Sequence, residues 1–256
     1  MRYARVSFLL KRGDNMLNKI DKLIKQVRTN MEKTSKSFLI QSEEDFLIRF
    51  AHESTKIEGN TLSIYEVKTL LVDKISVSGR SLREVFEVIN HEKAMKIVKE
   101  SLLRKKDLSE DLIKDLHQSL LENIFSGGVY RIQNVRISGA SFSPPSWMKV
   151  REEMANFIYM YQQNTKTMHP VNLAAWVHAE FVRIHPFSDG NGRTARILMN
   201  FILLKYGYLP IVIQYKDRAS YYEALDEFGK KKDPEKFLSF IQNLELQEIE
   251  RELAGE

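Results

Sequence analysis

A twelve-residue segment of this 256-residue chain combines residue types that can bind phosphate and accept a proton. The segment runs from His185 to Arg196 and reads HPFSDGNGRTAR. Proline ends a preceding helix, and the Asp-Gly-Asn-Gly sequence favours a tight turn before a new helix. The first turn of a helix has free N–H groups and the positive end of the helix dipole, which together attract phosphate. The segment therefore predicts a phosphate site beside His185, a candidate general base.

The new helix also carries charged side chains near the predicted phosphate. Arg193 and Arg196 are three positions apart, so both can lie on one helix face close to its N-terminus. Asp189 can hold a divalent cation beside the phosphates through its carboxylate oxygens. Gly190 and Gly192 allow the backbone to turn sharply and to approach a ligand closely.

Other ligand-binding patterns match the segment less well. A dinucleotide-binding Gly-x-Gly-x-x-Ala pattern requires a strand directly before its first glycine, and residues 183–189 do not read as a buried strand. An EF-hand loop starting at Asp189 would have Thr194 in place of its glycine and Asn200 in place of its glutamate. A P-loop would need a Gly-Lys-Ser/Thr sequence. A plain helix–turn–helix corner explains the glycines, but it does not explain two arginines and a histidine at one corner.

The segment resembles the motif of the Fic family, H-x-F-x-D/E-G-N-G-R-x-x-R. All eight fixed positions of that motif are filled in this chain, by His185, Phe187, Asp189, Gly190, Asn191, Gly192, Arg193 and Arg196. A second stretch, residues 217–225, is similar to the segment that follows the motif helix in that family. The resemblance extends over residues 108–245.

The resemblance implies transfer of the AMP part of ATP, with Mg²⁺, to a Ser, Thr or Tyr hydroxyl of a target protein, a reaction called AMPylation. Carried onto this chain, it implies that His185 deprotonates the target hydroxyl, that Asp189 binds Mg²⁺ and that Phe187 is a core anchor. The remaining motif residues would form the anion hole and hold the β- and γ-phosphates: Gly190, Asn191, Gly192, Arg193 and Arg196.

The resemblance also implies roles outside the motif. Tyr221 and Tyr222 would contact the adenine or the ribose, although packing within a helix is the simpler role for both. Residues 129–145 would form a flap along which the target protein binds. Self-modification fits this picture, and the N-terminal arm leaves a homodimer open as well.

A second segment is similar to the inhibitory motif of the family, S/T-x-x-x-E-G/N, and contains Ser54, Glu58 and Gly59. Glu58 ends a predicted helix, where a carboxylate is unfavourable beside the negative end of the helix dipole, and Gly59 suits the helix C-cap. Exposed glutamates are common, so the segment alone indicates little. Together with the complete catalytic motif, it predicts that Glu58 pairs with Arg196 and restrains the enzyme.

Most of the chain has the apolar spacing and the start signals of helices. A helix is expected from Ser42 to residue 56, and capping boxes are expected at Ser63 with Glu66 and at Ser81 with Glu84. Further helices are expected over residues 81–103, 109–120, 150–163, 171–183, 191–206, 218–228 and 234–252.

Only residues 129–137 read as β structure, because β-branched and aromatic residues lie there between Gly127-Gly128 and Pro144-Pro145. The expected fold is therefore all-α, a Fic-like helical bundle with one short β-hairpin flap. Two domains are expected: an N-terminal helical arm with the inhibitory motif over residues 1–104, and a Fic catalytic core over residues 105–256.

The composition restricts the class of protein. The chain has no cysteine, which excludes disulfides, thiolate zinc sites and cysteine nucleophiles and fits a reducing cytoplasm. No run of 18 apolar residues is present, so a membrane span is not expected. The other five histidines lack metal-ligand spacing and are expected to be surface or packing residues: His52, His91, His117, His169 and His178.

Two alternative functions stay open from the sequence. The same site could run in reverse and remove AMP from a modified target, with Glu58 orienting the attacking water. A basic helical DNA-binding regulator would fit the net charge of +5 and the helical content. Binding to DNA would weaken steeply as the salt concentration rises. No segment after residue 245 is long enough for a separate winged helix, which makes nucleic acid the less expected partner.

Overall fold

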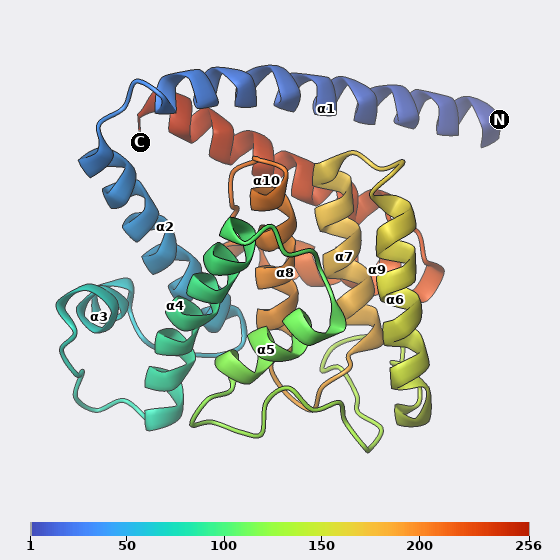
Figure 1. Cartoon of the computed structure of the whole chain (residues 1–256). Coiled ribbons are helices and arrows are strands. Elements are labelled where there is room, and N and C mark those ends of the chain that lie inside the picture. Colours follow the sequence, from blue (N-terminus) through green and yellow to red (C-terminus); the bar gives the residue numbers. More distant parts are fainter. Residues whose placement is uncertain (1, 256) are drawn as a thin grey trace.

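The computed structural model describes the backbone of residues 2–255 and the side chains of residues 15–255. Within this part of the chain the structure is a bundle of helices joined by loops and three short helical turns (Figure 1). The elements are α1 (Arg2–Met31), α2 (Lys36–Ile57), α3 (Ile64–Lys68), η1 (Thr69–Asp73), α4 (Leu82–Leu103), α5 (Glu110–Leu120), η2 (Trp147–Lys149), α6 (Val150–Asn164), α7 (Pro170–Ile184), α8 (Asn191–Lys205), η3 (Tyr215–Asp217), α9 (Arg218–Lys231) and α10 (Glu235–Ala254).

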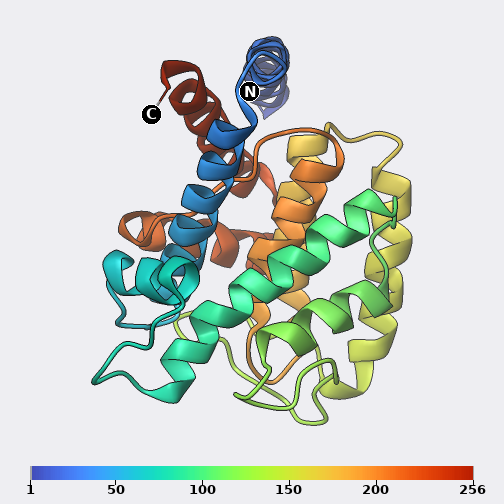
Figure 2. The same ribbon diagram turned by 60° about the vertical axis from the view of Figure 1, so that its left-hand side comes forward.

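Helices α7 and α8 form the centre of the bundle, and the loop between them carries the twelve-residue motif. Helix α6 packs on α7, while α4 and α5 pack on α8. The long helix α1 runs along α10 at one end of the molecule, and α2 packs against α4 (Figure 1). In the view turned by 60°, α2 lies on the opposite side of α8 from α6, and α4 crosses in front of α8 (Figure 2). The two segments with candidate functional residues, α2 and the start of α8, therefore belong to one packed unit.

Helix α8 is buried over most of its length, since 12 of its 15 residues are buried. Its apolar side chains, such as Phe201, join a single large core that includes Phe50 and Val98 as well as Phe181. The expected division at residue 104 thus falls between helices that share one core. The first turn of α8 is held by neighbours on several sides, which fixes the position of its arginines.

Helix starts agree with the capping signals in most places. Ser63 and Ser81 form the two expected capping boxes, each with its hydroxyl accepting from the third residue of its helix and the third residue's glutamate accepting from the serine N–H. The expected start of the second helix at Ser42 is wrong, because α2 begins at Lys36. The hydroxyl of Ser35 accepts the N–H of Phe38 at 3.3 Å and caps this earlier start.

The expected β-hairpin at residues 129–137 is also wrong, because this stretch contains no strand and forms an irregular loop. The side chain of Arg131 explains the difference. Its guanidinium donates to the carbonyl oxygens of His185, Gln133 and Pro145, and its N–H donates to Pro186 O at 3.0 Å. The backbone and side chain of Arg131 are thus bonded to the motif loop and to Pro145 rather than to a neighbouring strand.

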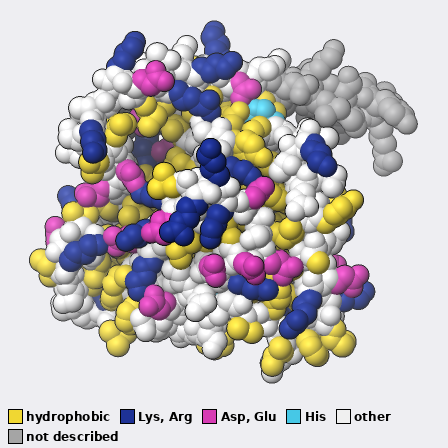
Figure 3. Space-filling view, in the orientation of Figure 1, with side chains coloured by type: hydrophobic (Ala, Val, Ile, Leu, Met, Phe, Trp, Pro, Cys, Tyr) yellow, Lys and Arg dark blue, Asp and Glu magenta, His cyan; other side chains and the backbone are white. Residues whose placement is uncertain are grey.

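On the outer surface, Lys and Arg side chains alternate with Asp and Glu over the face drawn in Figure 3, without forming a separate basic patch there. The hollow near the upper left of that view is a groove of about 810 Å³ between α2, α4 and α10, lined mostly by apolar residues such as Phe38, Phe46 and Leu102. None of the motif residues lines this groove. Among the described residues, no helix is long and apolar enough to cross a membrane.

Candidate active site

The candidate base, His185, ends α7 in the left-handed backbone conformation with φ 52° and ψ 58°. Its Nδ1 lies 3.3 Å from the carbonyl oxygen of Val182. A carbonyl can only accept, so Nδ1 carries the proton and the lone pair of the neutral ring lies on Nε2. Burial, followed by the charge of Arg131, lowers the pKa of His185 to about 4, so the ring is neutral at physiological pH. His185 is therefore prepared to accept a proton at Nε2.

The motif loop is held rigidly by two residues of its own. The side-chain amide of Asn191 accepts the N–H of Phe187 at 3.0 Å and donates to its carbonyl oxygen at 2.9 Å. Phe187 is fully buried, as expected for an anchor, and stacks on the ring of His117 with centroids 3.6 Å apart. The side chain of Asn191 thus closes the loop, which leaves its backbone as the part available to a ligand.

His117, on α5, holds the same loop through hydrogen bonds of its ring. Its Nδ1 accepts the N–H of Gly128 at 2.8 Å, and its Nε2 donates to the carbonyl oxygen of Asp189 at 2.9 Å. Burial lowers the pKa of His117 to about 4, which keeps the ring neutral and preserves this arrangement of donor and acceptor. The sequence placed this histidine among ordinary packing residues, and its contact with the motif loop is a finding of the structure.

Both motif glycines lie in close contact with neighbouring side chains. Gly190 has φ +73°, and a Cβ atom there would lie 2.6 Å from a methyl carbon of Leu121. At Gly192 a Cβ would lie 2.3 Å from Oε1 of Glu58. The carboxylate of Glu58 therefore lies directly against the start of α8, where the free N–H groups of the helix attract an anion.

Arg196 is fully engaged and buried, with 1% of its side chain exposed. Its Nη2 donates to Glu58 Oε1 at 2.7 Å and to the carbonyl oxygen of Ser54 at 2.9 Å, and its Nε donates to Ser54 Oγ at 2.8 Å. Its Nη1 lies 3.3 Å from the hydroxyl of Tyr221. Ser54 and Glu58, one helical turn apart on α2, thus hold the guanidinium of Arg196 together.

Ser54 has a second partner that fixes the direction of its hydroxyl. His91, on α4, donates from Nδ1 to the carbonyl oxygen of Glu87 at 2.7 Å, which leaves Nε2 as an acceptor 2.9 Å from Ser54 Oγ. Burial lowers the pKa of His91 to about 3. The serine O–H therefore donates to His91, and its lone pairs face Arg196.

Gly59 ends α2 as its sequence predicts. It has φ +104°, a backbone conformation that favours glycine, and its N–H donates to the carbonyl oxygen of Lys56 at 3.0 Å. Glu58 is the C-cap residue of α2, and its side chain points toward α8. The structure thus brings Ser54 and Glu58 to Arg196 of α8, while Gly59 ends α2.

Arg193 is also buried but lacks full pairing. Its Nη2 lies 3.3 Å from Asp189 Oδ1 and its Nη1 lies 3.6 Å from Glu87 Oε1. Its Nε and Nη1 atoms make no hydrogen bond to any described residue. A buried guanidinium with unpaired N–H groups is costly, so this side chain is suited to an anionic ligand that supplies the missing acceptors.

Asp189 lies at the entrance of the site with 36% of its side chain exposed. Its Oδ1 accepts the N–H of Gly190 at 2.6 Å, and its Oδ2 lies 2.5 Å from Nη2 of Arg83. Burial raises the pKa of Asp189, but Arg193, the Gly190 N–H and Arg83 together outweigh this effect and lower it. The carboxylate is therefore ionised at neutral pH, as a cation ligand must be.

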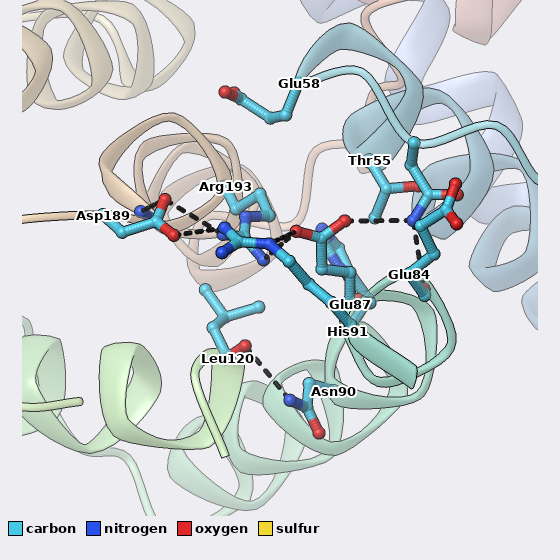
Figure 4. A network of polar contacts seen from close by, with 12 residues as sticks. Thr55, Glu58, Glu84, Glu87, Asn90, His91, Leu120, Asp189 and Arg193 are labelled. Carbon is cyan, nitrogen blue, oxygen red and sulfur yellow. Dashed lines mark hydrogen bonds and ion pairs between the residues drawn. The ribbon is translucent and has the colours of Figure 1, made fainter. Parts of the chain in front are cut away.

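Glu87 connects these groups from the second turn of α4. Its Oε2 accepts the amide of Asn60 at 3.0 Å, and its Oε1 faces Arg193 and lies 3.2 Å from Nε of Arg83. Figure 4 shows Asp189, Arg193 and Glu87 in a row, with the dashed contacts running between them. The charges of two carboxylates and two guanidinium groups cancel in this cluster.

The two tyrosines occupy different environments. Tyr221 is buried, and its hydroxyl lies 3.1 Å from Nε2 of His178. The same hydroxyl accepts from Nη1 of Arg196 at 3.3 Å and so helps to hold the guanidinium in place. Tyr222 has 38% of its surface exposed, and its hydroxyl lies 3.5 Å from the carbonyl oxygen of Ile57. Tyr222 is thus the tyrosine of the pair that is exposed near the end of α2.

A groove of about 550 Å³ adjoins the motif loop along residues 128–132. Exposed apolar side chains of Ile132 and Met148 line it together with Lys114 and Arg151. Its lining includes Arg131, whose guanidinium holds the carbonyl of His185 at 2.8 Å. Arg131 therefore lines the groove and also holds the backbone of the candidate base.

Several residues of the site have no motif of their own in the sequence. Arg83 and Glu87 lie on α4, His117 lies on α5, and Arg131 lies in the loop between α5 and η2. The capping box at Ser81 predicts the helix that carries Glu87 and His91. Their spacing of four residues places both on one face of that helix, which is a weak signal that they share a site. Their assignment to the site depends on how α4 packs against α8.

Comparison with protein families identifies residues 107–203 as matching the Fic/DOC family. The chain is 33% identical over 210 residues to a protein adenylyltransferase Fic from Drosophila melanogaster, covering 81% of this chain and 42% of that protein. It is 35% identical over 208 residues to the protein of the same name from Culex quinquefasciatus, covering 79% and 41%. The chain thus spans less than half the length of these curated relatives.

Solved structures show the same fold. Fic-1 (residues 134–508) from C. elegans superposes with a TM-score of 0.84 at 29% identity, covering 99% of this chain and 75% of that one. A Fic-domain-containing signaling protein from Bacteroides thetaiotaomicron has a TM-score of 0.83 at 26% identity, covering 94% of this chain and 97% of that one. The all-helical fold therefore agrees with the expectation, apart from the β-hairpin.

Proposed function

Residues 107–203 of this chain form a domain of the Fic/DOC family, and from this premise we propose that the protein transfers AMP from ATP to a Ser, Thr or Tyr hydroxyl of a protein. The observation that carries the proposal is the buried guanidinium of Arg193. Its unpaired N–H groups lie at the start of α8, where the helix dipole and free N–H groups also favour an anion. A polyphosphate supplies the acceptors that this side chain lacks.

The proton transfer is assigned to His185. The target hydroxyl oxygen attacks the α-phosphorus of ATP, the bond to the pyrophosphate oxygen breaks, and the hydroxyl proton passes to Nε2 of His185. The contact of Nδ1 with Val182 keeps the ring in the tautomer with its lone pair on Nε2. Because the ring is neutral at physiological pH, no prior deprotonation is required.

The carboxylate of Asp189 suits a role as one ligand of a divalent cation that a nucleotide holds mainly through its phosphates. It is ionised and half exposed, and no cluster of three acidic or histidine side chains occurs among the described residues. Mg²⁺ is often held by one or two carboxylates and completes its shell with phosphates and waters. When bound there, Mg²⁺ would neutralise phosphate charge. Asp189 holds its position through the Gly190 N–H.

We further propose that Glu58 restrains the enzyme. Its carboxylate lies against Gly192 and forms an ion pair with the buried Arg196, the residue assigned to a terminal phosphate. Negative charge there opposes a phosphate, and an occupied Arg196 leaves the α-phosphate poorly aligned for attack. A displacement of about 1 Å can reduce a rate by a factor of about 100, so inhibition does not require loss of ATP binding.

The target protein is assigned to the groove beside residues 128–132. Exposed Ile132 and Met148 offer apolar contacts, and the buried Arg131 links this loop to His185. Tyr222, half exposed beside the end of α2, is the better placed of the two tyrosines for a nucleoside contact.

The test is intact-mass spectrometry of the Glu58→Gly protein after incubation with ATP and Mg²⁺, alone and with candidate target proteins. We expect a gain of one AMP. The gain should vanish with EDTA and in the Glu58→Gly/His185→Ala double variant. A gain of one phosphate instead of AMP, or a gain that persists without His185, contradicts the proposed reaction.

The reverse reaction deserves a second test because Glu58 lies close enough to His185 to affect its pKa. A carboxylate near the base can orient a water toward an AMP-modified residue. Self-modified Glu58→Gly protein serves as the substrate for unmodified wild type. Loss of AMP with wild type, and no loss with added Glu58→Gly protein, would assign removal of AMP to Glu58.

A further inference from the structure

Arg83 places a positive charge on the carboxylate that the proposed function assigns to a divalent cation. It lies in the first turn of α4, 106 positions before Asp189, and its Nη2 is 2.5 Å from Asp189 Oδ2. The Arg83 side chain is 57% exposed, so this pair lies at the entrance of the site and in contact with solvent. No sequence motif assigned Arg83 a role.

The arrangement leaves neither oxygen of Asp189 free. Oδ1 accepts the Gly190 N–H at 2.6 Å and lies 3.3 Å from Arg193, while Oδ2 faces Arg83. The contacts of Oδ1 belong to the motif loop and its own helix. The contact of Oδ2 comes from a different helix, so it is the one that can be exchanged without disturbing the loop.

Arg83 has a second partner that makes this exchange inexpensive. Its Nε lies 3.2 Å from Oε1 of Glu87, one helical turn along α4. When Nη2 leaves Asp189, the guanidinium therefore keeps an ion pair with a carboxylate that is only 9% exposed. The side chain needs rotation about its own torsions and no movement of α4.

We propose that Arg83 is a built-in cation that occupies Asp189 in the free enzyme and must be displaced when a divalent cation binds with the nucleotide. This inference rests on the proposed function, because it concerns the same carboxylate. Arg83, Arg193, Asp189 and Glu87 sum to zero charge, so an incoming cation meets no net attraction from this cluster. Removing Arg83 leaves a charge of −1, which favours the cation.

The test measures cation binding directly and does not depend on turnover. Binding of Mn²⁺ is followed from the electron paramagnetic resonance signal of the free ion, with ADP present, for wild type, Arg83→Ala and Arg83→Gln. We expect both variants to bind Mn²⁺ at least about threefold more tightly than wild type, the size of effect typical of an exposed charge pair. The difference should shrink as the ionic strength is raised toward about 1 M, because salt screens exposed charges.

Lys93→Ala is the matched control, because Lys93 stands on the same helix and pairs with Glu122 at 2.6 Å outside the site. It removes the same charge from α4 and should leave Mn²⁺ binding within about twofold of wild type. Equal tightening in Lys93→Ala and Arg83→Ala would reduce the effect to net charge and overturn the inference.

Metal-free ADP binding, measured by calorimetry, separates two roles of Arg83. The inference expects no change in Arg83→Ala, whereas weaker ADP binding would make Arg83 a phosphate ligand and overturn it. The same measurements on Glu58→Gly keep the two proposals apart. If Glu58→Gly binds neither ADP nor Mn²⁺, the proposed function fails and this inference fails with it. If Glu58→Gly binds both and Arg83→Ala binds Mn²⁺ as wild type does, only the role of Arg83 is wrong.

Discussion

Glu58 and Arg196 are 138 positions apart in the sequence, yet Oε1 of the carboxylate lies 2.7 Å from Nη2 of the guanidinium. The arginine is buried and the carboxylate is 35% exposed, so Glu58 is the member of the pair that faces solvent. A Cβ atom added at Gly192 would lie 2.3 Å from the same oxygen, so this oxygen also lies on the first turn of α8. One carboxylate thus occupies the arginine and the helix N-terminus that a phosphate would use.

Replacing Glu58 by glycine should therefore raise self-AMPylation by at least about tenfold, which corresponds to about 1.4 kcal/mol of barrier. The variant removes the competing charge and frees Arg196. The measurement is incorporation of labelled AMP with ATP and Mg²⁺. Glu44→Gly, an exposed position on the same helix, is the control for a glycine in α2 and should leave the signal unchanged. The Glu58→Gly/Arg196→Ala protein should lose the gain. An unchanged signal in folded Glu58→Gly would leave Glu58 an ordinary helix-end residue.

His185→Ala should abolish AMP transfer and leave nucleotide binding intact, because the anion site and both arginines are untouched. An unperturbed histidine, with a pKa of about 6.5, would make the rate decline below that pH. Burial lowers the pKa of His185 to about 4, so the ring stays neutral well below that value. The transfer rate should hold from pH 8 to about pH 5.5 and then fall. A midpoint near 6.5, in a protein shown to be folded across the range, would contradict the buried environment.

Buried neutral histidines should make the protein less stable in weak acid. His117 has its pKa lowered to about 4 and accepts the Gly128 N–H, so the folded state resists its protonation. Below about pH 6.5 the unfolded chain binds a proton that the folded chain does not, and the free energy of unfolding falls as the pH falls. The expected slope is up to about 1.4 kcal/mol per pH unit for this residue between pH 6.5 and 4. Urea unfolding at pH 7 and pH 5 measures it.

His117→Gln is the comparison for that slope. An amide can still accept and donate a hydrogen bond but does not titrate, so the variant should lose part of the pH dependence. It should also be less stable at pH 7, because the stacking on Phe187 is lost. Identical slopes in wild type and His117→Gln would show that His117 does not govern acid stability.

Arg193→Ala should weaken binding of ATP more than binding of AMP, since AMP has only the α-phosphate. The side chain ends in unpaired N–H groups at the site assigned to the outer phosphates. Calorimetric titrations with the two nucleotides, with Mg²⁺ present, give the two losses. Lys205→Ala, at the other end of the same helix, is the control and should affect neither nucleotide. Equal losses for ATP and AMP would make Arg193 a structural residue.

The local features of this protein could be read from its sequence. The motif loop, the two capping boxes, the stop of α2 at Gly59 and the start of α8 depend on residues within a few positions of one another, and their stereochemistry is set locally. The pairing of Glu58 with Arg196 was also predicted, from two motifs taken together. That prediction depended on the resemblance, because an isolated glutamate at a helix end has many partners available to it.

Tertiary structure alone decided the rest. Ser35 rather than Ser42 caps α2: the hydroxyl of Ser35 accepts the N–H of Phe38, and Ser42 lies inside the helix. Residues 129–137 have β-forming side chains, but Arg131 bonds to the carbonyl oxygens of His185 and Pro145, which ties this stretch to the motif loop and to a later part of the chain. His117, Glu87 and Arg83 reach the motif from helices 70 to 110 positions away. Such contacts depend on how α4 and α5 pack on α8, and no spacing rule along the chain describes that packing.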